Sequence, residues 1–509
     1  MASASLFPKN VCDPADLPAG FLDFLKPLHE NFSPWQRELA NRRKDLLIQA
    51  VRNPPDHDRS EGPSSHRDEW YIEVPEWCAD QRNQMTGPAD DAELVVKMLN
   101  SGAPGVMIDL EDSIVNTWEH TKLGVANAVK ALHGELTYTN KKGDTVGIAP
   151  SGTVVFTRVR GLHMHQHGVF GAEPVAASLF DTALLVYQLD PSRLKHPICI
   201  YIPKSESALE AVWWCDLFTA LAAEKGLPED AIKCMALVES HPLAYQMEEF
   251  LYHLRHHILG LNLGRWDYMA SLLHHTLHDP KWVLPDRNTI PHDVPFFQRL
   301  RQLMVEVCHS RGALAVGGMT ALYPSRTDSA LNARALEVLE RDKKNEAAVG
   351  MDGAWTGHPD QNAIAVAQFP APNQLSRMGE MSDTLSDLRP PPIGVGKITY
   401  AGTCEAVRTV IRYRYGVLCG KGASLIDGYM EDLATDRIYR LMLAQRVRHQ
   451  VIYPDFFPEL LKDIFDRQFL LIIWDLPYED PNSHDEARRY AEAARISLAM
   501  ILNGDFDPT

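Results

Sequence analysis

The stretch Gly105-Val106-Met107-Ile108-Asp109-Leu110-Glu111-Asp112-Ser113 is an apolar run that ends in acidic residues, and it sets the pattern for the fold. Further apolar runs end in the same way, on a charged residue where a strand should give way to a loop. They are Val154–Phe156 before Arg158, Ile200–Ile202 before Lys204, Met235–Val238 before Glu239, Ile258–Leu261 before Arg265 and Asp267, and, after a longer turn, Ala354-Trp355 before Asp360. In a parallel βα barrel these strand ends converge on one mouth, where the active site lies. The pattern therefore predicts an enzyme with a carboxylate metal site.

Strand and helix patterns alternate from about residue 80 to 370. Gln84–Thr86 fits a first strand, followed by a helix from Asp91 to Leu99, and Leu314–Val316 fits another strand. These additions bring the strand count close to the eight of a closed barrel. Because strands that alternate with helices form parallel sheets, we expect an α/β fold of the TIM (β/α)8 type.

The segments that flank the barrel differ from it. Residues from about 20 to 51 carry apolar side chains at helical spacing, and Asn53–Arg67 is a polar loop. A short hairpin is expected near 133–153, and Ser386–Gly396 is a natural linker. Beyond it the pattern is mostly helical, around 401–415, 430–449 and 485–502. The expected division is 1–79, 80–388 and 389–509.

Composition narrows the class of partner. The chain has 509 residues and a formal net charge of −17, from 50 basic and 67 acidic side chains. This balance argues against a nucleic-acid surface or an anionic membrane as the main partner. A local arginine or a divalent cation could still hold an anionic substrate. The sequence leaves the oligomeric state open.

The ends of the chain and its cysteines indicate a cytoplasmic protein. No apolar run of about 18 residues exists, the N-terminus lacks an apolar signal core, and the C-terminus is not a Ser-Lys-Leu-type address. The eight cysteines have no CxxC spacing and are typical of reduced, structural thiols.

Three groups of charged residues carry the candidate chemistry. Glu239 and Asp267, at neighbouring strand ends, could supply the protein's share of an Mg²⁺ site; alternatively each pairs with an arginine such as Arg265 or Arg287. Arg158 could hold a carboxylate or stabilise an oxyanion, or form an ordinary salt bridge at the barrel rim. The acidic pair in Met430–Thr435, taken alone, would be a solvated helix face.

Several of these segments together resemble the malate synthase family, in family order from about residue 20 to 440. The matching segments are FLKPLHENF, DQRNQMTGPAD, MIDLEDS (107–113), TRVRGLH (157–163), VES (238–240), GLNLGRWDYM (260–269), GGMTALYPSR (317–326), GAWTGHP (353–359) and MEDLAT (430–435). The resemblance implies a TIM barrel with an N-terminal helical clasp and a C-terminal helical plug. It also implies a glyoxylate-cycle reaction, in which acetyl-CoA and glyoxylate condense and the thioester is hydrolysed to malate and CoA.

The resemblance assigns roles position by position. Glu239 and Asp267 match the Mg²⁺ ligands, and Asp109 and Glu111 match the acidic pair that supports the metal waters. Arg158 matches the active-site arginine and Asp432 the catalytic aspartate of the plug. Trp355 matches the tryptophan lining the acyl pocket. Substrate contacts are expected from Arg158, Gly264, Arg265, Trp266 and Trp355.

Some positions depart from the family pattern and leave the acceptor open. Met269-Ala270 stands where a bulky aromatic is usual, so a pocket faced by Ala270 would have more room than glyoxylate needs. The last 60 or so residues do not align. The alternatives are a larger 2-oxo acid, a different acyl-CoA, a malyl-CoA-type lyase, or a catalytically silent homologue; the presence of all four proposed catalytic and metal residues argues against the last.

Overall fold

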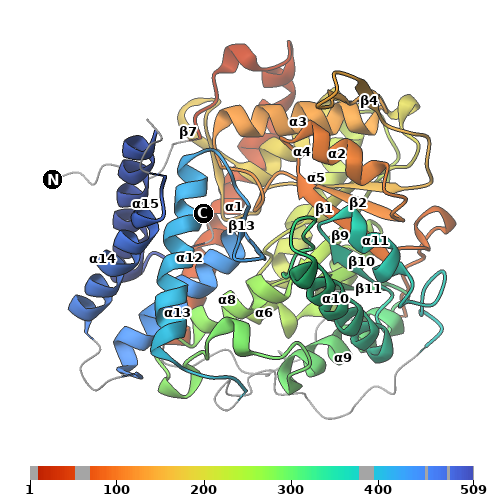
Figure 1. Ribbon diagram of the computed structural model, residues 1–509. Coiled ribbons are helices and arrows are strands. Elements are labelled where there is room, and N and C mark those ends of the chain that lie inside the picture. Colours follow the sequence, from red (N-terminus) through yellow and green to blue (C-terminus); the bar gives the residue numbers. More distant parts are fainter. Residues whose placement is uncertain (1–9, 52–68, 378–394, 453–456, 478–481, 508–509) are drawn as a thin grey trace.

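A closed barrel of eight parallel strands forms the centre of the computed structural model, which describes residues 10–51, 69–377, 395–452, 457–477 and 482–507 (Figure 1). Around the barrel the order is β1-β12-β11-β10-β9-β8-β5-β2. The expected α/β TIM barrel is confirmed. The strands are β1 (Asn83–Pro88), β2 (Gly105–Asp109), β5 (Val154–Arg158), β8 (Ile198–Ile202), β9 (Ile232–Val238), β10 (Ile258–Leu263), β11 (Leu314–Met319) and β12 (Gly353–Thr356).

The barrel strands are nearly continuous apolar runs because both of their faces are buried. Phe156, Tyr201, Met235 and Leu237 point into an interior cluster, while neighbours such as Ile200 belong to the shell beneath the helices. The covering helices are α2 (Ala92–Leu99), α3 (Trp118–Leu132), α4 (Ala177–Gln188), α5 (Ala208–Glu224), α6 (His241–Ala244), α7 (Met247–His253), α8 (Arg265–His275), α9 (Pro295–Ser310), α10 (Ser329–Val349) and α11 (Pro359–Val366).

The helix that the apolar spacing predicted near residues 20 to 51 is α1 (Phe21–Ala50), and it packs on the outside of the barrel. Phe21 meets the Phe180 ring edge-on at 5.9 Å, and Phe32 meets Trp213 at 5.7 Å. The polar loop predicted for 53–67 lies outside the described residues. Short 3-10 turns occur at Pro14–Asp16, Glu76–Cys78, Pro191–Arg193, Pro280–Trp282 and Arg287–Thr289.

Three hairpins lie outside the barrel in the part of the chain that the structure describes. The predicted hairpin is confirmed as β3 (Thr137–Thr139) and β4 (Thr145–Gly147). Sequence patterns missed the other two. The pair β6 (His165–Gly168) and β7 (Gly171–Ala176) follows the end of β5, and β13 (Ser424–Ile426) with β14 (Tyr429–Glu431) interrupts the helical C-terminal region.

The C-terminal helices build a second apolar core, which includes residues of α8 (Figure 1). They are α12 (Tyr400–Leu418), α13 (Leu433–His449), α14 (Pro458–Trp474) and α15 (Ser483–Asn503). Three match the predicted periodic segments, while α14 was missed. Most of the linker expected at Ser386–Gly396 lies outside the described residues. No helix within the described ranges is both long and apolar enough for a bilayer crossing.

Candidate active site

A cavity of about 590 Å³ lies at the carboxyl ends of the barrel strands. Its wall includes most of the residues singled out from the sequence, and the C-terminal region closes part of it. The expected residues that line it are Asp109, Arg158, Glu239, Gly264, Arg265, Trp266, Asp267, Trp355 and Asp432. Residues 420–423, in the turn after α12, also contribute. The cavity therefore lies between the barrel and the C-terminal region.

Arg158 is held by Asp109 at the base of this cavity. The Nε and Nη2 groups of Arg158 each donate a hydrogen bond of 2.6 Å to one oxygen of Asp109. Asp109 also accepts the backbone N–H groups of Glu111 and Ser113, so its oxygens are fully engaged. Burial alone would lower the pKa of Arg158, but Asp109 and Asp112 more than offset this and raise the pKa well above its usual value. Arg158 is therefore a fixed cation.

Lys204 is the second buried cation of the site. Its Nζ lies 2.5 Å from Asp112, 3.2 Å from Glu111 and 3.5 Å from Asp267. Its backbone has a positive φ of 46°, and its N–H donates to Glu239 Oε1 at 2.5 Å. Lys204 thus ties together four acidic side chains. The sequence placed Lys204 at a strand end, where an ion pair is plausible, but it did not reveal which acidic side chains surround it. It missed Asp112 altogether, although Asp112 lies within the acidic run after β2.

Glu239 and Asp267 lie next to each other, after β9 and in the first turn of α8. Burial raises the pKa of Glu239 well above its usual value, and the charge of Asp267 adds to that shift. Burial also raises the pKa of Asp267, where the charge of Asp112 adds to the shift. Gly264 allows this approach, because a Cβ there would lie 2.7 Å from Cβ and Oε2 of Glu239. Neither carboxylate pairs with Arg265 or Arg287, so that alternative is wrong.

The donor set fits a divalent cation. Six carboxylates face the fixed charges of Arg158 and Lys204, and the excess negative charge is what a divalent cation would offset. Asp267 Oδ1 and Asp112 Oδ1 are buried without a hydrogen-bond partner. Burial and Asp112 raise the pKa of Glu111 to about 8. In the described ranges, no group of three or more His, Cys, Asp or Glu side chains is arranged to hold a metal ion by itself.

Asp432 reaches the cavity from the C-terminal region. It caps α13, where its side chain accepts the backbone N–H of Thr435 at 3.2 Å. The preceding hairpin is tied to the barrel, because the N–H of Met430 donates to the Ala321 carbonyl and Arg287 pairs with Glu431 at 2.6 Å. Asp432 is thus half-buried at a domain junction, and the interpretation as a solvated helix face is wrong.

The environment of Asp432 makes it a stronger base than an ordinary carboxylate. Burial, Asp112 and Asp267 together raise its pKa to about 7, while Thr435 and Arg158 lower it. A carboxyl group with such a pKa can accept a proton from a weak carbon acid more readily than an exposed aspartate can. Arg158 lines the same cavity, so a developing negative charge has a cation to meet.

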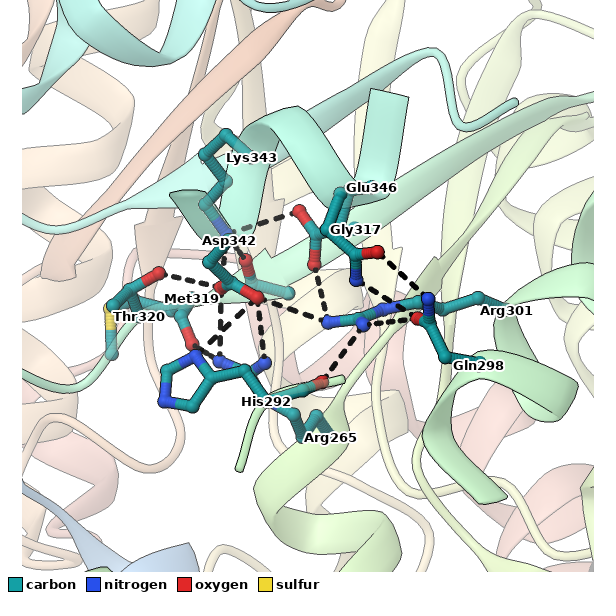
Figure 2. A network of polar contacts seen from close by, with 12 residues as sticks. Arg265, His292, Gln298, Arg301, Gly317, Met319, Thr320, Asp342, Lys343 and Glu346 are labelled. Atoms are coloured by element: carbon teal, nitrogen blue, oxygen red, sulfur yellow. Dashed lines mark hydrogen bonds and ion pairs between the residues drawn. The ribbon is translucent and has the colours of Figure 1, made fainter. Parts of the chain in front are cut away.

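The Arg265 side chain belongs to a buried polar network (Figure 2). It bonds Asp342 at 3.2 Å and donates to the Met319 carbonyl at 2.9 Å. Arg301 and Lys343 also pair with Asp342, at 3.2 and 3.3 Å. This network fixes the start of α8, and with it the neighbouring Trp266 and Asp267. Sequence patterns did not reveal it, because its members come from α8, α9, β11 and α10.

Comparisons with known proteins bear on these residues. Residues 154–388 match the family model for the malate synthase TIM-barrel domain, and 397–507 match the model for the malate synthase C-terminal domain. The expectation that the last 60 or so residues do not align with the family is therefore wrong. Malate synthase A of Escherichia coli is 35% identical over 508 residues, covering 95% of this chain and 93% of the relative. The chain belongs to the malate synthase family. A malate synthase from Streptomyces clavuligerus is 36% identical over 448 residues, covering 85% of this chain and 82% of the relative.

Solved structures agree on the fold. A Haloferax volcanii malate synthase, solved as a pyruvate/acetyl-CoA ternary complex, aligns with a TM-score of 0.52 and 17% identity. The alignment covers 78% of this chain and 99% of the Haloferax volcanii chain.

Ala270 does not line the active-site cavity: it is fully buried among apolar residues of α8 and the C-terminal helices. The expectation that Ala270 enlarges the acceptor pocket therefore has no structural basis.

Proposed function

We propose that this enzyme condenses acetyl-CoA with glyoxylate and hydrolyses the thioester, giving malate and CoA, which makes it an acyltransferase. The observation that carries the proposal is the meeting of Asp432, from the C-terminal region, with Arg158, Glu239 and Asp267, from the barrel, around one cavity. The family membership of the whole chain supports it. We also propose the division into an N-terminal clasp (1–79), a barrel (80–388) and a C-terminal plug (389–509).

Asp432 and Arg158 form the proposed catalytic pair. Asp432 would take a proton from the methyl group of acetyl-CoA, and its raised pKa suits that task. Arg158 would stabilise the charge on the resulting enolate oxygen, and Asp109 would hold Arg158 in position. The enolate carbon then attacks the aldehyde carbon of glyoxylate, and water cleaves the thioester.

Glu239 and Asp267 are the proposed Mg²⁺ ligands. The chemistry that Mg²⁺ supplies when bound is polarisation of the aldehyde carbonyl of glyoxylate. The unpartnered Asp267 Oδ1 and the excess of carboxylates support this assignment. Glu111 and Asp112 would orient water around the cation through hydrogen bonds, and Lys204 would keep the acidic cluster together. Asp109 has no free oxygen for that task.

Substrate contacts are proposed for Gly264, Arg265, Trp266 and Trp355, all of which line the cavity. The Trp355 indole donates to Gln84 Oε1 at 2.8 Å and its ring lies 5.9 Å from the Arg158 guanidinium carbon, which suits a wall beside the acyl group. A larger acceptor or a lyase reaction is not favoured, since the burial of Ala270 removes the expected extra room and the C-terminal base is in place.

The test is release of free thiol from acetyl-CoA with Mg²⁺, measured with glyoxylate, pyruvate and larger 2-oxo acids. Release with glyoxylate is expected, and Asp432→Asn should reduce kcat by roughly 10²- to 10⁴-fold, the usual contribution of general base catalysis. Malate formation should match thiol release mole for mole. Release only with a bulkier acceptor, or malyl-CoA accumulation, would contradict the proposal.

A matched control keeps the site-residue assignment separate from folding. Asp436→Asn changes a buried aspartate of the same helix that pairs with Arg414 and Arg440 but does not line the cavity. It is expected to lower the free energy of unfolding with little change in kcat of the folded enzyme. Asp432→Asn should instead lower kcat with little change in the free energy of unfolding. Equal effects of the two variants on kcat would remove Asp432 from the catalytic role.

A further inference from the structure

A second cavity, of about 670 Å³, lies beside the active site and shares Trp266 with it. Its walls come from the segment 287–293, from one face of α10, from residues 321–322 and from Tyr429 of β14. On α10, the lining positions 334, 338, 341, 345 and 348 recur every three or four residues, which places them on one helical face. Apart from Trp266, none of the residues proposed for the reaction above lines this cavity.

The second cavity is basic in a chain that is strongly acidic overall. Arg287, Arg334, Arg341 and Lys344 line it, against Asp293 and Asp342. Asp342 is already paired with Arg265, Arg301 and Lys343, so it adds little negative charge to the cavity. The chain as a whole has a net charge of −17, so this group of cations differs in sign from the overall charge. Such a local positive charge favours an anionic ligand.

The basic side chains of this cavity have hydrogen-bond donors that are not in use. Among the residues that the structure describes, no hydrogen bond or ion pair engages the side chains of Arg334, Arg341 or Lys344, and these three are exposed. Arg287 is 4% exposed; its Nη1 pairs with Glu431, but its Nε and Nη2 are buried without a hydrogen-bond partner. A guanidinium with unused donors in a cavity is suited to a carboxylate or phosphate oxygen.

We propose that this cavity is a binding site for a small multivalent anion of the phosphate or carboxylate class, distinct from the catalytic cavity. Arg341, Lys344 and Arg334 would attract the ligand, and Arg287 would bind its innermost oxygen. Asn288, which also lines the cavity, donates a hydrogen bond to Glu405 at 2.9 Å.

The site touches the catalytic machinery at two points. Arg287 pairs with Glu431, which directly precedes Asp432. The Arg287 guanidinium also lies 5.0 Å from the Trp266 ring, which directly precedes Asp267. An anion at Nε or Nη2 of Arg287 and Glu431 at Nη1 use different donors but compete for the positive charge of one guanidinium, and that competition is the physical link between the two cavities. Removal of the Glu431 charge therefore leaves more of the positive charge of Arg287 for the anion.

The experiment is calorimetric titration of the full chain with tripolyphosphate and, separately, with citrate. The buffer is free of Mg²⁺, which both anions chelate, and ionic strength is held constant. The test variant is Arg341→Gln/Lys344→Gln, and Glu431→Gln tests the competition. The control is Lys141→Gln/Lys142→Gln, which removes the same charge from two exposed lysines in the turn between β3 and β4. Unfolding curves confirm that each variant is folded.

The expected result is saturable binding of at least one anion, weakened tenfold or more in Arg341→Gln/Lys344→Gln, unchanged in the control, and tightened several-fold in Glu431→Gln. Binding of tripolyphosphate alone would assign the phosphate class, and binding of citrate alone the carboxylate class. Equal affinity in the wild type and Arg341→Gln/Lys344→Gln would place the anion elsewhere and overturn the proposal, as would the absence of binding by both anions. These outcomes do not depend on whether the chain makes malate.

Discussion

Asp109 and Arg158 are register partners on the neighbouring strands β2 and β5, and their side chains form two hydrogen bonds of 2.6 Å each. This geometry holds the guanidinium in one plane at the base of the active-site cavity. The two bonds leave Nη1 and the second N–H of Nη2 to face other groups, and Nη1 lies 3.5 Å from Asp112 and 3.7 Å from Glu111. Asp109 is thus a positioning residue, which acts on the reaction through Arg158.

Asp109→Asn should therefore reduce kcat through misplacement of Arg158. An amide can accept only one of the two N–H groups and lacks the charge, and the loss of one oxyanion donor typically costs about 10²- to 10³-fold in kcat. The KM for acetyl-CoA should change less. The check is a double-mutant cycle with Arg158→Lys: in that background Asp109→Asn should cost little. Additive losses would show that Asp109 acts independently of Arg158.

Gly264→Ala should impair the proposed metal site. The new Cβ would lie 2.7 Å from Cβ and Oε2 of Glu239, so this buried carboxylate must move. Disturbance of groups that orient a metal ligand typically costs about 10- to 100-fold in metal affinity. The measurement is the Mg²⁺ concentration that half-saturates activity. Gly152→Ala is the control, because a Cβ there meets nothing within 4 Å. Equal Mg²⁺ dependence in both variants would contradict the placement of Glu239 as a ligand.

Ala270→Val tests whether this position controls the acceptor. Ala270 is fully buried between α8 and the C-terminal helices, away from the cavity lining. Two added methyl groups should overpack this core and lower the free energy of unfolding by about 1–3 kcal/mol. The ratio of kcat/KM for glyoxylate to that for pyruvate should stay the same. A changed ratio in the folded variant would restore Ala270 to the acceptor pocket.

The sequence predicted the parts of the fold that local pattern determines. The barrel strands are apolar runs with charged ends, and α1, α12, α13 and α15 have clear apolar periodicity, so these elements were found. The helix α14 was missed, and it leaves Leu470, Leu471 and Trp474 largely exposed, so its apolar residues do not mark one buried face. The hairpin β13–β14 was missed because its strands are three residues long and depend on the barrel segment 321–323.

The sequence allowed single residues of the active site to be identified, but it did not show which of them contact one another. Charged strand ends and family motifs identified Arg158, Glu239 and Asp267. Their partners could not be read in the same way, because a pair such as Lys204 and Asp112 is 92 positions apart and meets only when the barrel closes. The same holds for the network around Asp342, whose charges look like an ordinary helix surface in the sequence but are buried in the fold (Figure 2).

His309 should make the stability of the barrel depend on pH. It is 3% exposed, and its two ring nitrogens each lie 3.0 Å from an acceptor: the Arg377 carbonyl and Asp352 Oδ2. Both nitrogens must donate, so the folded state favours the imidazolium. Burial alone would lower the pKa of His309, but the hydrogen bond and charge of Asp352 outweigh this and raise it above its usual value of 6.5.

Because the folded-state pKa is raised, the contribution of His309 to stability is fully present below about pH 6.5, the unfolded value, and is lost as pH rises through the folded pKa. The difference in free energy of unfolding between the wild type and His309→Gln should therefore shrink from acidic to alkaline pH, in urea titrations at several pH values. In an Asp352→Asn background the cation loses its partner, so the difference should no longer shrink as pH rises. A difference that grows with pH would mean that His309 is neutral in the folded chain.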